Sequence, residues 1–101
     1  MANCNLVGPI PSWIGNLKEL RQLDLQHNNI SGKLPKEIGN LVNLLYLNVK
    51  DNSNLGGEVL VESFSKLNKL NRLSLVNCNF VNTQDALELL QVRLPRCRIW
   101  I

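Results

Sequence analysis

Few side chains in this chain could take part in catalysis. The single histidine, His27, could act as an acid or a base, but that role needs an orienting partner and a pocket, and the sequence indicates neither. Asp24 and Asp51 are not spaced as a pair of carboxylates suited to hydrolysis. We therefore expect His27 to be a solvent-exposed rim residue and the protein not to be an enzyme.

The cysteines and the glycines do not form a recognisable cofactor motif. Cys4, Cys78 and Cys97 lack C-x-x-C spacing, and with one histidine they make no convincing zinc site. The sequence contains neither a P-loop nor a G-x-G-x-x-G motif. We expect no metal and no cofactor, and we expect all three cysteines to be reduced and inward-facing.

Composition narrows the class of protein. The 101 residues suit one domain, and 45% hydrophobic content with 5% aromatic residues predicts an aliphatic core. The net charge of +3 is spread along the chain, which argues against a nucleic-acid partner. Without a long apolar run or a signal peptide, the sequence predicts no membrane contact and a cytoplasmic location, or secretion only if the chain is a fragment of a longer precursor.

A repeat organises the chain. Leu17, Leu20, Leu23, Leu25 and Asn28 recur 24 residues later as Leu41, Leu44, Leu47, Val49 and Asn52, and again after a further 26 residues as Leu67, Leu70, Leu73, Leu75 and Cys78. This spacing is typical of a solenoid built from strand-and-turn coils. Cys4, Asn28, Asn52 and Cys78 share one position, where an inward asparagine can bond the backbone of the bend.

Short alternating stretches predict one strand in each coil. Leucines face the core at alternate positions, so the intervening side chains face solvent on a parallel sheet. Three rows result across the strands: Gln22, Tyr46, Arg72 and Arg98; Asp24, Asn48, Ser74 and Trp100; and Gln26, Lys50 and Val76.

The return path of each coil has its own landmarks. Gly8, Gly32 and Gly57 mark a turn, and Pro11 and Pro35 favour an extended entry in the first two coils. The third coil has Leu60 at the proline position and two extra residues, which predicts an outward bulge on that side.

Residues 8–49, with their N-x-x-G-x-I-P and I-G-N-L elements, resemble the plant-specific class of leucine-rich repeats. The resemblance implies an α/β solenoid, a right-handed superhelix with a short parallel sheet on its concave face. It also implies a module that binds proteins, peptides or small ligands without catalysis.

The two ends differ. Repeats starting near Leu17, Leu41 and Leu67, after a partial first repeat, fill residues 1–80. Residues 81–101 predict a cap: a helix over 82–94 with Asn82 or Thr83 at its start and an apolar stripe of Leu87, Leu90 and Leu94, then an edge strand. This cap resembles that of intracellular leucine-rich repeat proteins.

The N-terminal edge lacks a preceding coil to cover its apolar side chains, which include Leu6, Ile10, Ile14 and Leu17. Either the chain is part of a longer array or is folded over at this edge, or a second copy covers the edge in a homodimer. Asn29-Ile30-Ser31 is a glycosylation sequon with an exposed Asn29, which matters only in a secreted protein.

The sequence thus predicts a non-enzymatic module whose partner is a protein or peptide on the concave face, with Tyr46, Arg72 and Trp100 as anchors because such side chains often dominate interfaces. Two alternatives remain: a self-associating unit, or a ligand-binding fragment of an extracellular receptor. The full set of expected contact residues is Gln22, Asp24, Gln26, Tyr46, Asn48, Lys50, Arg72, Ser74, Arg98 and Trp100.

Overall fold

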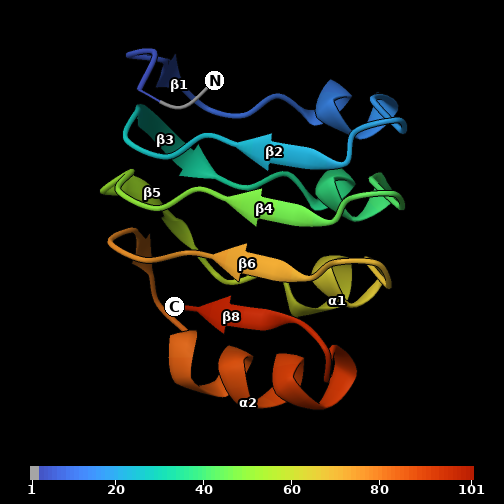
Figure 1. The fold of residues 1–101 in the computed structure, drawn as a ribbon. Helices are drawn as coiled ribbons and strands as arrows, with labels where there is room; N and C mark the ends of the chain where they lie inside the picture. Colours follow the sequence, from blue (N-terminus) through green and yellow to red (C-terminus); the bar gives the residue numbers. More distant parts are fainter. Residues whose placement is uncertain (1–2) are drawn as a thin grey trace.

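The chain folds as a stack of coils whose strands lie side by side (Figure 1). The computed structural model describes residues 3–101. One parallel sheet runs down the stack in the order β2-β4-β6-β8. Its strands are β2 Gln22–Asp24, β4 Tyr46–Asn48, β6 Arg72–Ser74 and β8 Arg98–Trp100. The predicted parallel sheet is confirmed, and β8 covers the residues where the alternation predicts the last strand.

A second parallel sheet, absent from the prediction, follows the turn of each coil in the order β1-β3-β5-β7. Its strands are β1 Val7–Gly8, β3 Asn29–Lys33, β5 Asn54–Gly57 and β7 Asn79–Phe80. Gly8, Gly32 and Gly57 have φ angles of 87°, 76° and 78°, a left-handed conformation that glycine adopts without strain. Because glycines interrupt the strands of this second sheet, the sequence shows no period-two alternation from which these strands could be predicted.

Short helices complete the coils. The 3-10 helices η1 Ser12–Asn16 and η2 Lys36–Asn40 begin directly after Pro11 and Pro35, both extended as predicted. In the third coil, where Leu60 replaces the proline, the segment is instead the α-helix α1 Val61–Ser65. One of the two extra residues of this coil lies in this segment, between Leu60 and Leu67, and the other precedes Gly57.

Neighbouring coils approach closely at the glycine of the I-G-N-L step. A Cβ on Gly39 would lie 2.8 Å from the carbonyl oxygen of Ser63, and one on Gly15 would lie 2.7 Å from that of Glu37. Both distances are too short for a carbon atom against backbone. The step therefore carries glycine because the next coil passes over it, which also brings the leucine columns into contact.

The core is a set of aliphatic columns. Leu41, Leu44, Leu47 and Val49 of the middle coil are fully buried, and their counterparts in the next coil are nearly so. Leu17 differs, because its side chain is 42% exposed whereas Leu41 and Leu67 are 0% exposed. The repeat thus predicts the core correctly where a coil has neighbours on both sides.

The predicted asparagine position is confirmed at Asn52, which is fully buried. Its Nδ2 donates to the carbonyl oxygens of Leu25 (2.9 Å) and Val49 (2.8 Å), and its Oδ1 accepts from the Ile30 N–H at 3.0 Å. In the next coil the Cys78 thiol donates to the Val49 carbonyl oxygen at 3.2 Å. One side chain in each coil therefore bonds the bend of its own coil to that of the coil before it.

Cys4 departs from the prediction because it is exposed. Its N–H donates to Asn28 Oδ1 at 3.1 Å, but within residues 3–101 no coil packs on its outer side. Cys78 and Cys97 are half-buried against the core. Burial raises the pKa of both thiols, that of Cys97 to about 11.

The helix α2 Thr83–Arg93 closes one end of the stack (Figure 1). Leu90 and Leu94 of the predicted stripe are buried, whereas Leu87 is only half-buried and Ala86 is buried in its place. Asn82 is at the N-cap position of the helix, as predicted, but its side chain makes no capping hydrogen bond. Its Oδ1 accepts from the Val59 N–H at 2.6 Å instead, because the preceding coil offers an unpaired backbone group there.

None of the helices in residues 3–101 has the length and apolar character needed to cross a bilayer.

We expect Asn52→Ala to lower the free energy of unfolding by roughly 2–3 kcal/mol, because the Ile30 N–H and the Leu25 carbonyl would be buried without partners. Urea denaturation followed by circular dichroism measures this. Asn54→Ala is the matched control, since Asn54 is exposed and should change the free energy by less than about 0.5 kcal/mol. Equal losses in both variants would contradict the role given to Asn52.

The raised pKa of Cys97 predicts slow alkylation. With a pKa of about 11 instead of 9.0, the reactive thiolate at pH 8 is roughly 100-fold scarcer in the folded protein than in the denatured chain. Its reaction with iodoacetamide should accelerate roughly tenfold per pH unit from pH 8 to 10. Peptide mass spectrometry of folded and urea-treated protein measures both rates, and a folded-state plateau below pH 9.5 would contradict the assignment.

Candidate functional site

The concave sheet carries a shallow groove of about 280 Å³. It is lined by Tyr46, Asn48, Lys50, Arg72, Ser74, Val76 and Trp100. Six of these residues belong to the contact set expected from the sequence, and Val76 belongs to the third row. The structure therefore brings the expected anchors Tyr46, Arg72 and Trp100 to one place.

Strand register builds this groove. Tyr46 pairs with Arg72 and Arg72 with Arg98, while Asn48 pairs with Ser74 and Ser74 with Trp100. Side chains two apart on a strand share a face, so both rows lie on the side opposite the leucines. Positions in the repeat therefore determine which side chains meet.

The middle row is less accessible than the alternation predicts. Asn48 is 4% exposed and Ser74 is 8% exposed, so they form the floor of the groove instead of a contact surface. The flanking rows cover them, an effect of sheet curvature that the sequence pattern does not contain. Trp100 is 46% exposed and stands at the side of the groove.

Hydrogen bonds hold the floor in one arrangement. Asn48 Oδ1 accepts from the Lys50 N–H at 3.1 Å, and Asn48 Nδ2 donates to the Tyr46 hydroxyl oxygen at 2.8 Å. The amide is therefore oriented by the backbone. Tyr46 is in turn held by Asn48.

The remaining expected contact residues lie outside the groove. Gln22 and Arg98 are exposed next to it. Asp24 is half-buried, and its Oδ1 and Oδ2 accept from the backbone N–H and the side-chain Nε2 of Gln26 at 3.3 and 3.0 Å. The side chains of Asp24 and Gln26 are therefore occupied with each other.

His27 has a partner that the sequence did not reveal. Its Nδ1 lies 2.9 Å from Asp51 Oδ2, and Asp51 Oδ1 accepts from Asn77 Nδ2 at 2.7 Å. The three residues share a column, and all have left-handed φ angles of 56° to 63°. His27 is exposed, as expected of a rim residue, but it has an acidic partner that the sequence pattern did not indicate. Within residues 3–101, however, no hydroxyl or thiol bonds to His27, so the column links turns and forms no nucleophilic site.

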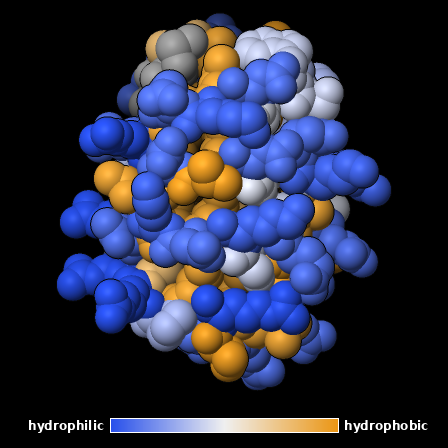
Figure 2. Space-filling model, turned by 90° about the vertical axis from the view of Figure 1, so that its right-hand side faces the viewer, coloured by the Kyte–Doolittle hydropathy of each residue, from blue (hydrophilic) through white to orange (hydrophobic). Residues whose placement is uncertain are grey.

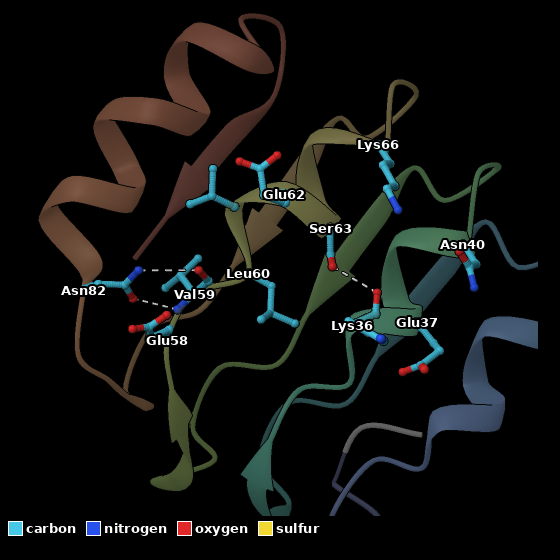
Figure 3. A pocket seen from close by; sticks show the side chains of 11 residues that line it. Lys36, Glu37, Asn40, Glu58, Val59, Leu60, Glu62, Ser63, Lys66 and Asn82 are labelled. Carbon is cyan, nitrogen blue, oxygen red and sulfur yellow. Dashed lines mark hydrogen bonds between the residues drawn. The ribbon is translucent and has the colours of Figure 1, made fainter.

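A cleft of about 670 Å³ lies between η2 and α1 (Figure 3). Hydrophilic side chains cover most of the face that carries these helices (Figure 2). Positively charged lysines and negatively charged glutamates both line the cleft. The hydroxyl of Ser63 donates a hydrogen bond to the Lys36 carbonyl oxygen at 3.0 Å. The cleft is thus larger than the concave groove but offers no converging set of chemical groups.

The opposite end of the stack from α2 has an apolar hollow of about 410 Å³. Leu6, Ile10, Ile14 and Leu17 all line it, together with Trp13. Ile10 and Ile14 are only 8% exposed, so this part of the expected open edge is better covered than the sequence suggests. The large hydrophobic side chains around it that are exposed are Val7, Trp13 and Leu17.

Among residues 3–101, no three histidine, cysteine, aspartate or glutamate side chains gather where they could hold a metal ion.

Comparisons with known proteins indicate the family to which this solenoid is related. A family model described as leucine rich repeat matches residues 2–53. No curated protein sequence matches the chain significantly. In the crystal structure of PEPR1–AtPEP1, a similar chain is 42% identical with a TM-score of 0.71, and the match covers 75% of this chain and 10% of that one.

Two further structures match over most of the chain. The ectodomain of the Arabidopsis thaliana receptor kinase GASSHO1/SCHENGEN3, in complex with CASPARIAN STRIP INTEGRITY FACTOR 2, is 31% identical with a TM-score of 0.75, covering 92% of this chain and 11% of that one. A Leptospira interrogans leucine-rich repeat protein is also 31% identical with a TM-score of 0.74, covering 93% and 22%.

This chain therefore spans less than a quarter of the length of each of these proteins. The solenoid of stacked parallel strands and the family match over half of the sequence agree: the chain belongs to the leucine-rich repeat family.

Proposed function

We propose that this chain is a non-catalytic interaction module that binds a protein or peptide in its concave groove. The observation that carries the proposal is the meeting of Tyr46, Arg72 and Trp100 around one groove on the sheet. Aromatic and arginine side chains bury large areas while keeping a polar group, and they dominate many interfaces. Two similar structures are complexes, one with AtPEP1 and one with CASPARIAN STRIP INTEGRITY FACTOR 2, which supports this reading.

Rigidity also supports a binding role. The floor residue Asn48 bonds both the backbone and Tyr46, so the groove is ordered before a partner arrives. A preformed surface loses less conformational entropy on binding than a flexible one. The groove is too shallow and too open to enclose a small substrate, which favours an extended partner over an enzymatic substrate.

The likeness to the GASSHO1/SCHENGEN3 ectodomain bears on where in or outside the cell this chain is located. The sequence alone predicts a cytoplasmic protein, with secretion as the alternative for a fragment of a longer precursor. The likeness to an ectodomain favours the extracellular alternative. Asn29 of the sequon is exposed, so its side chain is accessible for a glycan in that case.

We expect Tyr46→Ala combined with Arg72→Ala to weaken binding of a peptide selected from a random library at least tenfold, roughly 1.4 kcal/mol. Both side chains are on the solvent side of the sheet, so circular dichroism should show an intact fold. Fluorescence anisotropy with the labelled peptide measures the affinity.

Lys36→Ala combined with Lys66→Ala is the matched control, because both lysines line the cleft on the helical face. These changes should leave the affinity as it is. Loss of binding in the lysine variant, with full binding in the groove variant, would place the interaction on the other face and refute the proposal.

A second candidate function is self-association through the apolar hollow next to η1. The observation that favours it is the exposure of Val7, Trp13 and Leu17 around this hollow, 71%, 59% and 42% respectively. A second copy would remove this apolar surface from water, which is the main driving force of homodimer formation.

If the hollow mediates a homodimer, light scattering should give about twice the chain mass of 11.4 kDa for the wild type and a single chain mass for Leu17→Lys. Leu17 suits the test better than Ile14, because it is exposed and its substitution should leave the fold intact. Val92→Lys is the control, since Val92 is 78% exposed on α2 at the other end. A monomeric wild type at micromolar concentration would rule out this candidate.

A further inference from the structure

The charged side chains that line the concave groove have one sign. Two of its lining residues are charged, Lys50 and Arg72, and both are cationic. Arg98 adds a third positive charge, because it lies directly opposite Arg72 in the parallel register. Within residues 3–101, neither arginine has an ion-pair partner. Like charges on paired strands repel each other. An anion bound between the two arginines would reduce this repulsion and would therefore be stabilised there.

Within residues 3–101, no carboxylate forms an ion pair with Lys50, Arg72 or Arg98. Asp24 is held by Gln26, and Asp51 accepts from His27 and Asn77 on the turn side of the sheet. Both are thus bonded to other side chains. Asp24 keeps its negative charge, because the amide of Gln26 is neutral, but it does not line the groove, whose own charged residues are both cationic.

Hydrogen-bond donors in the groove outnumber acceptors. The backbone N–H of Lys50 occupies Asn48 Oδ1, so Asn48 Nδ2 must donate to the Tyr46 oxygen. The Tyr46 hydroxyl hydrogen therefore points away from Asn48, and within residues 3–101 this hydroxyl donates no hydrogen bond. The hydroxyl of Ser74 on the floor likewise donates no hydrogen bond within residues 3–101. A matching partner must bring acceptor oxygens.

One side of the groove is apolar. Trp100 is 46% exposed, and Val76 lies with it along the groove. A side chain that packs there must be apolar or aromatic to gain from the contact. The groove thus places an apolar surface beside a cationic, donor-rich one.

We propose that the groove recognises an acidic peptide segment in which a carboxylate side chain is followed closely by an apolar side chain. The carboxylate accepts hydrogen bonds from the Tyr46 hydroxyl and Arg72, with Lys50 and Arg98 adding charge, and the apolar side chain packs on Trp100. This inference rests on the proposed function and adds the chemical class of the partner. A carboxylate fits better than a nucleic-acid phosphate, because Tyr46 bonds to Asn48 and Trp100 is the one aromatic ring left to stack on a base.

The test uses a fluorescein-labelled peptide of about ten residues, which at roughly 3.3 Å per residue crosses the sheet. The peptide carries two Glu–Phe pairs spaced by Gly and Ser, and its twin has Gln in place of each Glu. The acidic peptide should bind at least tenfold more tightly than the twin to the wild-type chain, the size expected for one charge-assisted hydrogen bond. The difference should shrink as salt rises from 50 to 500 mM, because added ions screen the charges.

Three variants locate the interaction. Arg72→Gln should lower the affinity for the acidic peptide about tenfold and leave the affinity for the twin unchanged. Tyr46→Phe should lower the affinity for the acidic peptide a few-fold, because it removes one hydrogen-bond donor. Lys66→Gln, on the helical face, removes the same net charge and should leave the affinity unchanged. Equal losses for Arg72→Gln and Lys66→Gln would show attraction to net charge alone and overturn the inference.

The remaining outcomes separate the two proposals. If the twin binds as tightly as the acidic peptide and the variant with both Tyr46→Ala and Arg72→Ala loses both peptides, the acidic specificity is wrong while the concave binding function stands. If neither peptide binds, this inference fails, and the library selection described above decides the broader function. If a single-stranded oligonucleotide displaces the acidic peptide at lower concentration than the unlabelled peptide itself, the groove prefers phosphate and the inference is overturned.

Discussion

The structure depends on how the chain satisfies its backbone where each strand bends into the core. At this bend Asn52 bonds the carbonyl oxygens of Leu25 and Val49 and the N–H of Ile30, which come from two successive coils. Without such a side chain, burying the bend would leave these backbone groups without partners and would offset part of what the adjacent leucines gain. The same bonds fix the offset between coils, so that leucines of one coil lie over those of the next.

The fixed offset also arranges the outer face of the sheet. Tyr46, Arg72 and Arg98 lie in one row because the leucines behind them must lie in register. The outward residues do not themselves hold the coils together, so their chemistry can change while the scaffold stays the same. Binding character in such a solenoid is therefore a property of rows of side chains that are distant in sequence. Here the rows bring cations and one exposed indole together on the last three strands.

The repeat spacing predicted the parallel sheet, the aliphatic core and the groove residues, because all of these follow from position within a coil. It did not predict what depends on the three-dimensional path between repeats. The second sheet has too many glycines to show alternation, and Asn48 and Ser74 are buried by neighbours on a curved surface. The His27–Asp51 contact arises because both residues adopt a left-handed turn in successive coils. Asn82 binds Val59 because α2 packs under the third coil, a contact that local capping patterns cannot foresee.

The two ends of the stack explain why one molecule presents two different candidate surfaces. At the end closed by α2, the buried Ala86, Leu90 and Leu94 cover the last leucines, so β6 and β8 are supported from below and the groove between them keeps its shape. Next to η1, Leu17 has no such cover within the described residues and remains partly in water. A cationic, ordered groove selects partners by charge and hydrogen bonds, whereas an apolar hollow attracts any matching apolar surface. The groove is thus the better candidate for specific recognition, and the hollow for association with another coil of the same kind.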